Sequence, residues 1–305
     1  MRVRFEWFWP TFDRQNNFFV DALKILHGEV EVVTDRLEHC DLEVVSVFSP
    51  QKNSNLNRLS NLRKKIPHGQ PDTNLLYPTK FDPDTKNFSR RIWYGVENVR
   101  APYQLDIDGY ISFDQDTLDG YNAYFATWYE LSGIQLPFTN NRVGLTTSAS
   151  ELLEKRSFFG RKSKFACAFI GKPDQMRFRA INELRKIGEV DVFGPMVGKP
   201  ISNKPEIAKD YKYMVCLEND NYPGYVTEKL LEAYLSDTVP LYWGNLGNDS
   251  SINRKGFSNL LDFESMSEWI EYVRNIDEYA YVNMYEQAHL NNVPDLTPIY
   301  NVLVG

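Results

Sequence analysis

Residues 211–244 contain a strand, a polar loop, a helix and a second strand in close succession, which constrains the fold more than any other segment. Apolar residues dominate 211–217 and 238–242, which predicts two strands buried inside a sheet. The stretch 218–224 between them is rich in Asn, Pro and Gly, as is typical of a loop. Thr227 can act as the N-cap of a helix with one apolar face. This order of elements predicts an α/β fold.

The start of the predicted helix carries charges that need an explanation. Free amides at a helix N-terminus favour anions, so Lys229 in the first turn opposes the helix dipole. Glu228 and Lys229 could form a solvated surface pair, the usual outcome for such neighbours. A cation at this place is explained if an anionic ligand lies between it and the helix end. The turn therefore predicts a phosphate site, at the position where α/β sheets bind ligands.

A resemblance to a known family lies in residues 218–244, which read ENDNYPGYVTEKLLEAYLSDTVPLYWG. This run resembles the signature of the α-1,3/α-1,4-fucosyltransferases of glycosyltransferase family 10, the bacterial members above all. The resemblance is dense over 165–244 and thin over 1–138. It implies two Rossmann-like domains that face each other across a cleft, the GT-B type of fold. It also implies that fucose is transferred from GDP-fucose with inversion of configuration.

The resemblance assigns two cations to the donor diphosphate, Lys229 and Arg177. Arg177 lies at the start of a predicted helix that follows a strand and a loop, again a favourable place for phosphate. Arg179, two residues further, is the competing choice and lies on a different helix face. A charge that stabilises the departing diphosphate is a catalytic group, so Arg177 and Lys229 are candidate catalytic residues.

Five further residues match donor-side positions of the family. Asn219 and Tyr225 resemble its donor-binding residues, and Glu228 resembles the glutamate that binds the ribose or lies near fucose. Glu218 is expected either to bind the donor or to orient the loop. Gly194 ends a VDVF strand that resembles a family segment beside the nucleotide. Its missing side chain would permit close approach of the donor, although a plain turn glycine is the simpler interpretation.

A general base is also needed, because the acceptor hydroxyl loses its proton as it attacks. Glu97 follows a predicted strand and resembles the family glutamate that serves as this base on the acceptor side. A carboxylate at a strand end otherwise acts as a loop cap. Glu97 is therefore the third candidate catalytic residue.

Metal ions are not expected to be essential, although Mg²⁺ or Mn²⁺ could stimulate the reaction. Two D-x-D pairs, Asp106 with Asp108 and Asp114 with Asp116, resemble manganese ligands of other glycosyltransferases. They lie far from the donor motif in sequence, so turn capping is the expected role, and Asp114 is a candidate for shaping the acceptor side. The four histidines form no pair with metal-ligand spacing.

A chain of 305 residues is natural for two α/β domains. We expect an acceptor-side domain over 1–138 with an insertion at about 50–90, a connection over 139–163, and a donor-binding domain over 164–305. The C-terminal helices are expected to pack back toward the first domain. Outside the signature we expect strands at 2–9, 29–33, 42–48, 91–94, 110–113, 165–170 and 189–193, and helices at 18–26, 56–65, 176–187, 265–276 and 279–290.

Composition restricts the partners and the compartment. A net charge of −7 and a pI near 5.3 argue against nucleic acid as a partner. Three scattered cysteines suggest buried free thiols rather than a disulfide framework. No apolar run is long enough to span a membrane, and no signal peptide or anchor is evident. The expected location is the cytoplasm, with peripheral attachment at the inner membrane as an alternative.

The acceptor and the sugar ring are not encoded in any motif. A glycan such as N-acetyllactosamine or lactose is the expected acceptor, with α-1,3 linkage favoured over α-1,4. Transfer from another GDP-sugar is one alternative, and a non-catalytic nucleotide- or carbohydrate-binding protein is another. A metal-dependent phosphate-ester hydrolase that uses the D-x-D pairs is a third, but it lacks supporting ligands.

Overall fold

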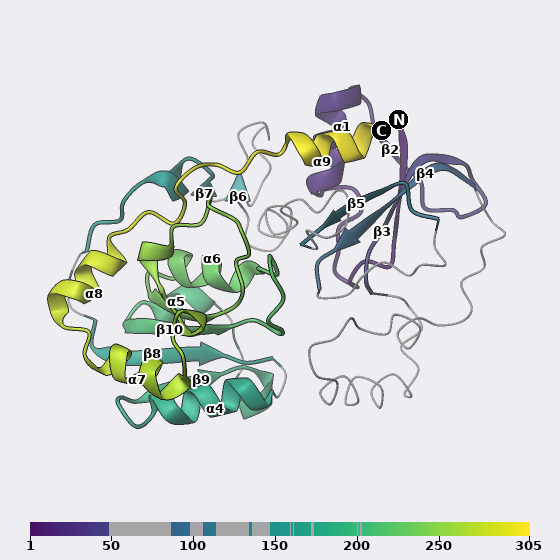
Figure 1. Cartoon of the computed structure of the whole chain (residues 1–305). Helices are drawn as coiled ribbons and strands as arrows, with labels where there is room; N and C mark the ends of the chain where they lie inside the picture. The colour runs from purple at the N-terminus through teal and green to yellow at the C-terminus, as the bar shows by residue number, and fades with distance from the viewer. Residues whose placement is uncertain are drawn as a thin grey trace. The chain divides into compact units, whose positions relative to one another are not determined.

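The computed structural model describes residues 1–48, 87–97, 106–113, 134–135, 147–158, 160, 162–171, 174–199, 201 and 203–305. The chain divides into two compact units, Met1–Ala126 together with Asp295–Gly305, and Thr127–Pro294 (Figure 1). Each unit is built on a parallel sheet with helices, which confirms the predicted α/β class. The predicted insertion at about 50–90, with its helix at 56–65, lies almost entirely outside the described residues.

The first unit contains five parallel strands in the order β2-β1-β3-β4-β5. They are β1 (Arg2–Glu6), β2 (Glu31–Val32), β3 (Cys40–Val45), β4 (Phe88–Gly95) and β5 (Gly109–Ser112). Helix α1 (Phe18–His27) begins at Asn17, whose side chain accepts a hydrogen bond from the Val20 amide, and places Phe19 against Phe5 of β1. Helix α9 (Thr297–Val304) packs on α1 and β5. The last helix of the chain therefore belongs to the first unit.

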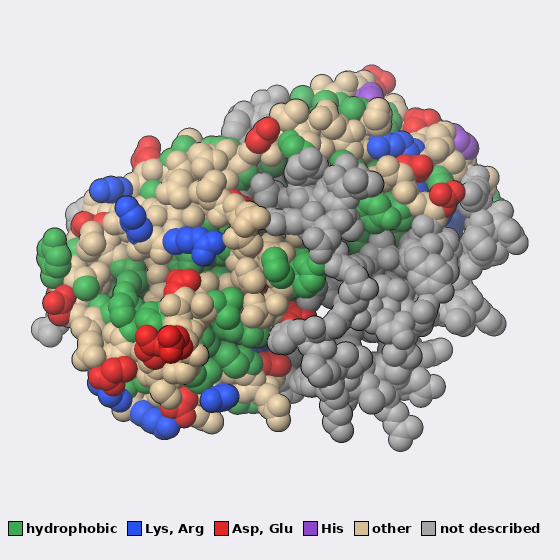
Figure 2. All heavy atoms as spheres, viewed as in Figure 1, with side chains coloured by type: hydrophobic (Ala, Val, Ile, Leu, Met, Phe, Trp, Pro, Cys, Tyr) green, Lys and Arg blue, Asp and Glu red, His purple; other side chains and the backbone are tan. Residues whose placement is uncertain are grey.

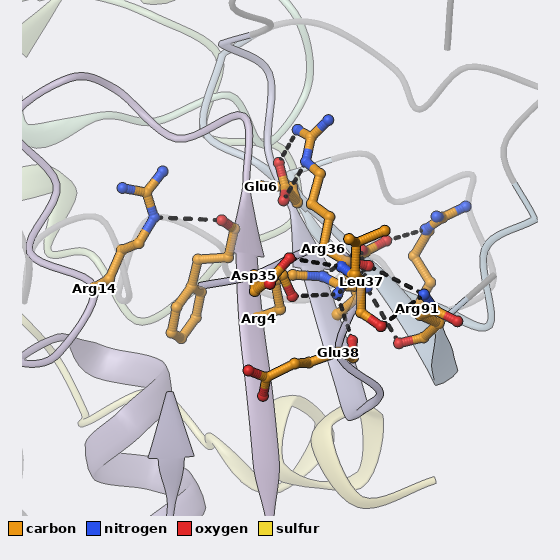
Figure 3. A network of polar contacts seen from close by, with 11 residues as sticks. Arg4, Glu6, Arg14, Asp35, Arg36, Leu37, Glu38 and Arg91 are labelled. Atoms are coloured by element: carbon orange, nitrogen blue, oxygen red, sulfur yellow. Dashed lines mark hydrogen bonds and ion pairs between the residues drawn. The ribbon is translucent and has the colours of Figure 1, made fainter. Parts of the chain in front are cut away.

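The other face of this sheet carries a ladder of buried charges (Figure 3). Arg4, Glu43 and Arg91 are register partners on β1, β3 and β4. Glu43 accepts hydrogen bonds from Arg4 at 3.0 Å and from Arg91 at 2.6 Å. Arg4 also donates to the carbonyl of Glu38 at 3.0 Å, in the connection between β2 and β3. These buried charges are paired with each other and with backbone, so loss of one partner would leave a buried charge uncompensated.

The second unit contains five parallel strands in the order β12-β11-β10-β8-β9, and a separate pair β6-β7. The strands are β6 (Ile134–Gln135), β7 (Thr147–Ser148), β8 (Lys164–Phe169), β9 (Val190–Phe193), β10 (Tyr211–Leu217), β11 (Val239–Trp243) and β12 (Ser258–Asn259). The α-helices are α4 (Gln175–Leu184), α5 (Lys204–Ala208), α6 (Glu228–Leu235), α7 (Met266–Arg274) and α8 (Glu278–Tyr285). Both C-terminal helices α7 and α8 stay with this unit, unlike α9.

The core of the second unit lies between the sheet and its helices. Trp269 of α7 is fully buried, and its indole nitrogen donates to the Ser258 hydroxyl at 2.9 Å. Leu241 of β11 and Ala166 of β8 are also fully buried in this cluster. Strands that are apolar on both faces must be covered on both sides, as the sequence indicated for this part of the chain.

The order of the strands determines where a ligand can bind. Numbered along the chain, each large sheet has the order 2-1-3-4-5, so the winding direction changes between the first and third strands. Ligands of such sheets bind outside the carboxyl ends of the strands at that change. In the second unit this point lies between β8 and β10, and the predicted loop 218–227 follows β10 directly.

Two negative findings concern the surface of the described residues. None of their helices is long and apolar enough to cross a membrane. On the face drawn in Figure 2, basic and acidic side chains of the second unit are interspersed with apolar and neutral ones, with no broad basic surface.

Candidate functional site

The loop between β10 and α6 is closed by one buried carboxylate. Glu218 is only 1% exposed and accepts hydrogen bonds from the Thr227 amide at 2.9 Å and the Thr227 hydroxyl at 2.7 Å. It also accepts from the Tyr242 hydroxyl at 3.1 Å and from the Lys229 amine at 3.1 Å. Four donors thus satisfy the carboxylate, which ties the start of the loop to its end and to the neighbouring strand β11.

Gly244 leaves the space that this carboxylate needs. A Cβ atom at position 244 would lie 2.8 Å from Cγ of Glu218 and 2.3 Å from the Tyr242 hydroxyl oxygen. Both contacts are closer than packed atoms tolerate, so a side chain at this position would push Glu218 or Tyr242 out of place.

Helix α6 begins where the sequence predicts, but Thr227 does not cap it as expected. Thr227 occupies the N-cap position without a side-chain capping bond. Its hydroxyl donates to Glu218 and accepts from the Lys229 amine at 2.8 Å. The sequence prediction was therefore right about the helix start, but the hydroxyl oxygen of Thr227 accepts from the Lys229 amine and from no backbone amide of the first turn.

Lys229 is held beside two carboxylates. Its amine lies 3.1 Å from Glu218 and 3.7 Å from Glu228, and its side chain is 22% exposed. Burial lowers the pKa of Lys229, but the charges of Glu218 and Glu228 outweigh this effect, so the pKa is raised. Burial raises the pKa of Glu228, but Lys229 and the helix backbone outweigh it, so this pKa is lowered. Both groups are therefore charged at neutral pH.

Arg177 reaches the same loop from helix α4. Asp174 caps this helix by accepting from the amides of Met176 at 2.9 Å and Arg177 at 3.2 Å. The Nη2 atom of Arg177 donates to the carbonyl of Leu217, at the end of β10, at 3.2 Å, and to the side-chain oxygen of Asn219. Arg179, the competing choice, is exposed. The structure thus brings Arg177 to the loop.

The two cations lie within electrostatic reach of each other. Burial and the two carboxylates have the largest effects on the pKa of Lys229. The charge of Arg177 has a smaller effect and lowers this pKa. Among the described residues, the hydrogen bonds of Arg177 run through Nη2, so Nη1 and Nε keep their donors for a ligand. Two like charges at the end of one strand favour an anion between them.

Asn219 and Tyr225 extend this arrangement. The Asn219 amide nitrogen lies 3.5 Å from the Tyr225 hydroxyl, and Tyr225 is only 2% exposed. Arg177, Asn219 and Tyr225 therefore form a chain of polar contacts across the loop. The structure brings together six of the predicted residues at this place, and they are Arg177, Glu218, Asn219, Tyr225, Glu228 and Lys229.

Gly194 follows the carboxyl end of β9, the edge strand that pairs with β8. Its φ angle is +121°, and a Cβ atom there would lie 2.3 Å from the carbonyl oxygen of Ile170. Position 194 therefore requires glycine for a close approach to the chain's own backbone at the end of β8. This approach accounts for the glycine without a ligand.

Glu97 belongs to the first unit, two residues beyond the end of β4, and is half-buried. Asp108 accepts from the backbone amide of Arg91 at 2.7 Å, a structural contact at the start of β5. Asp114 and Asp116 lie outside the described residues. Within the described residues, no group of three His, Cys, Asp or Glu side chains is placed to hold a metal ion.

Three contributors to the site were not predicted. The Thr227 hydroxyl and the Tyr242 hydroxyl both serve Glu218. Lys204 of α5 pairs with Glu232 of α6 at 2.6 Å. Burial raises the pKa of Glu228 and Lys229 lowers it, and the charge of Lys204 lowers it by a smaller amount. Thr227 and Tyr242 lie inside the signature, which is the only sequence signal for them.

Comparisons with known proteins find similarity over the part of the chain that contains this site. Residues 159–289 match the family model for the C-terminal part of glycosyltransferase family 10 (fucosyltransferase). The chain is 32% identical over 128 residues to an α-(1,3)-fucosyltransferase of Helicobacter pylori, a match that covers 41% of this chain and 27% of that protein. It is 29% identical over 199 residues to a 4-galactosyl-N-acetylglucosaminide 3-α-L-fucosyltransferase of Rattus norvegicus, which covers 63% of this chain and 50% of that protein. The matches thus span half or less of these relatives.

The fold is also similar to that of a solved structure. The crystal structure of an α1,3-fucosyltransferase with GDP-fucose matches with a TM-score of 0.66 at 20% identity, over 100% of this chain and 90% of that one. At this identity the match supports the fold. The similarity to the family lies in the signature and in the match over 159–289.

Proposed function

We propose that this chain, whose residues 159–289 match the model of glycosyltransferase family 10, transfers L-fucose from GDP-fucose to a hydroxyl of a glycan acceptor. The proposal rests above all on one observation. Arg177 and Lys229 come from different helices and converge at the carboxyl end of β10, beside the N-terminus of α6. Fixed cations and helix amides at this place suit the diphosphate of a nucleotide sugar.

The proposed reaction is a single displacement. The acceptor oxygen bonds to the anomeric carbon of fucose while the bond from that carbon to the diphosphate oxygen breaks. The electron pair of the broken bond leaves with GDP, whose growing charge Arg177 and Lys229 stabilise. Glu97 takes the proton of the acceptor hydroxyl. Attack on the face opposite the leaving group inverts the anomeric configuration.

Glu218 has a supporting part in this proposal. Its four hydrogen bonds orient Lys229 and hold the loop that carries Asn219 and Tyr225. Glu228, ionised and half-buried beside Lys229, is the proposed partner of the ribose hydroxyls. A carboxylate readily accepts hydrogen bonds from hydroxyl groups and would repel the diphosphate. Glu228 would therefore bind the ribose of GDP-fucose and keep the diphosphate away from itself.

The proposed acceptor is an N-acetylglucosamine or glucose unit of a glycan such as N-acetyllactosamine or lactose, with α-1,3 linkage preferred. The names of the relatives from Helicobacter pylori and Rattus norvegicus support this linkage. Cys40, Cys167 and Cys216 are buried free thiols, which suits a reducing compartment, so the cytoplasm is the proposed location.

A panel of GDP-sugars and acceptors tests the proposal. The purified protein is offered GDP-fucose, GDP-mannose and UDP-galactose, each with lactose, N-acetyllactosamine and the isomeric type 1 chain. We expect turnover with GDP-fucose and a new α-1,3 linkage by NMR. Turnover with GDP-mannose alone would favour the alternative of another GDP-sugar. GDP binding without any transfer would favour a non-catalytic binding protein.

A further inference from the structure

One buried acceptor in the loop between β10 and α6 has no partner. The side-chain oxygen of Asn221 is shielded from solvent and makes no hydrogen bond, although the residue as a whole is only half-buried. Buried polar atoms are nearly always paired, so an exception in a ligand-binding loop needs an explanation.

The position of Asn221 is fixed from both sides. Its backbone amide donates to the carboxylate of Asp220 at 2.7 Å. Further along the loop, the amide of Gly224 donates to the carbonyl of Asn245 at 2.8 Å, and the amide of Tyr225 donates to the carbonyl of Tyr222 at 3.0 Å. The unpaired oxygen therefore belongs to an anchored turn.

The chemistry of an amide oxygen restricts what can bind to it. It accepts hydrogen bonds and therefore needs an N–H or O–H donor. An ionised diphosphate offers only acceptors, and Arg177 and Lys229 already supply donors for it. The donor groups of a GDP-sugar are the hydroxyls of fucose and of ribose and the N–H groups of guanine. Of these, the hydroxyls flank the diphosphate that Arg177 and Lys229 would hold, and guanine lies beyond the ribose.

We propose that Asn221 accepts a hydrogen bond from a hydroxyl group of the bound donor, on fucose or on ribose. The inference rests on the proposed function and adds a residue that selects for a hydroxylated sugar. A buried acceptor left unpaired in the free protein discriminates strongly, because a ligand without the matching hydroxyl leaves it unpaired again.

Calorimetry with Asn221→Ala tests the inference, with GDP and GDP-fucose as the titrated ligands and no acceptor present. Loss of one neutral hydrogen bond predicts roughly three- to tenfold weaker binding of GDP-fucose. If fucose supplies the hydroxyl, GDP affinity stays unchanged, and if ribose supplies it, both affinities fall by the same factor. Unchanged affinity for both ligands would overturn the inference.

Two controls make the result specific. Asn248→Ala removes an exposed asparagine from the loop after β11 and is expected to leave both affinities unchanged. GDP-sugars that lack one hydroxyl should bind the unsubstituted protein more weakly but lose nothing further in Asn221→Ala. If the unsubstituted protein fails to bind GDP-fucose at all, the proposed function falls, whereas normal binding that is insensitive to position 221 refutes only the role of Asn221.

Discussion

Glu218 accepts hydrogen bonds from both the backbone amide and the hydroxyl of Thr227, at 2.9 and 2.7 Å. These two residues stand at the two ends of the loop that carries the candidate donor contacts. Lys229 and Tyr242 complete the coordination of the same carboxylate. The geometry of the site therefore depends on a side chain that is itself only 1% exposed, and that acts by holding others in place.

Replacing Glu218 by Gln should destabilise the protein. An amide has one acceptor oxygen in place of two, so its NH₂ group would face either the Thr227 amide and the Tyr242 hydroxyl or the Thr227 hydroxyl and the Lys229 amine. We expect a loss of about 2–3 kcal/mol in the free energy of unfolding, the scale of lost hydrogen bonds to a charged group. Urea denaturation measures it.

The matched control is Glu206→Gln. Glu206 pairs with Lys209 on the surface of α5, where both side chains are more than half exposed. Exposed pairs contribute little, so this variant should stay within about 0.5 kcal/mol of the unsubstituted protein. Equal effects of the two substitutions would show that the network around Glu218 does not stabilise the fold.

Arg177→Ala and Lys229→Ala should each lower turnover by roughly 10² or more, because each removes a charge that stabilises the departing diphosphate. Arg179→Ala is the control, since Arg179 is exposed on the same helix. Steady-state kinetics with GDP-fucose measure the effects. Full activity in Arg177→Ala together with a loss in Arg179→Ala would refute our assignment of the phosphate-binding arginine.

Local patterns in the sequence predict most of the elements. The helix predicted over 265–276 is found as α7, because Trp269, Ile270 and Val273 share one buried face. The strand, loop and helix around 218–227 are likewise found where their turn residues and apolar runs place them. These features depend on neighbours in the sequence, so they can be inferred without a structure.

Contacts between distant residues are what the sequence does not reveal. Tyr242 lies on the next strand, 24 residues after Glu218, and the ion pair of Lys204 with Glu232 joins residues 28 apart. The hydroxyl of Thr227 illustrates the same point, because local propensity predicts that its oxygen caps the helix, while in the structure this oxygen accepts from the Lys229 amine. Tertiary packing decides which hydrogen-bond partner a side chain finds, and no pattern in a single sequence encodes this choice.

Turnover should not require a metal ion. Arg177, Lys229 and the N-terminus of α6 supply the positive potential that Mn²⁺ supplies at the diphosphate in other enzymes. Activity in excess EDTA should remain close to that of the untreated enzyme, with at most a mild stimulation by added Mg²⁺ or Mn²⁺. Complete loss in EDTA that Mn²⁺ restores would instead point to the D-x-D pairs.

His289 should make stability depend on pH. Burial, together with a smaller effect of the Arg156 charge, lowers its pKa to about 3, so the folded protein keeps this ring neutral. The unfolded chain takes up a proton near pH 6.5, so the contribution of His289 is fully present above that pH and is lost as the pH falls toward 3. At pH 5 the loss amounts to about 2 kcal/mol.

Denaturation of His289→Phe between pH 7 and pH 4 tests this expectation. A phenyl ring can keep the contact with Tyr234, whose ring centre lies 4.9 Å from that of His289. The variant should lose less stability on acidification than the unsubstituted protein does. His27→Gln, at an exposed position on α1, should keep the original slope. An unchanged slope in His289→Phe would contradict the prediction.

Glu97→Gln should separate the chemical step from donor binding. The substitution preserves the shape of the side chain and removes its basicity, so the acceptor hydroxyl loses its proton acceptor. We expect fucose transfer to fall by at least ~10², the scale of general-base catalysis, while GDP affinity stays nearly unchanged. That combination also excludes a pure binding protein, because such a protein has no turnover to lose. If Glu97→Gln transfers fucose at the normal rate, the base lies elsewhere, and Glu228 and Asp114 become the next positions to substitute.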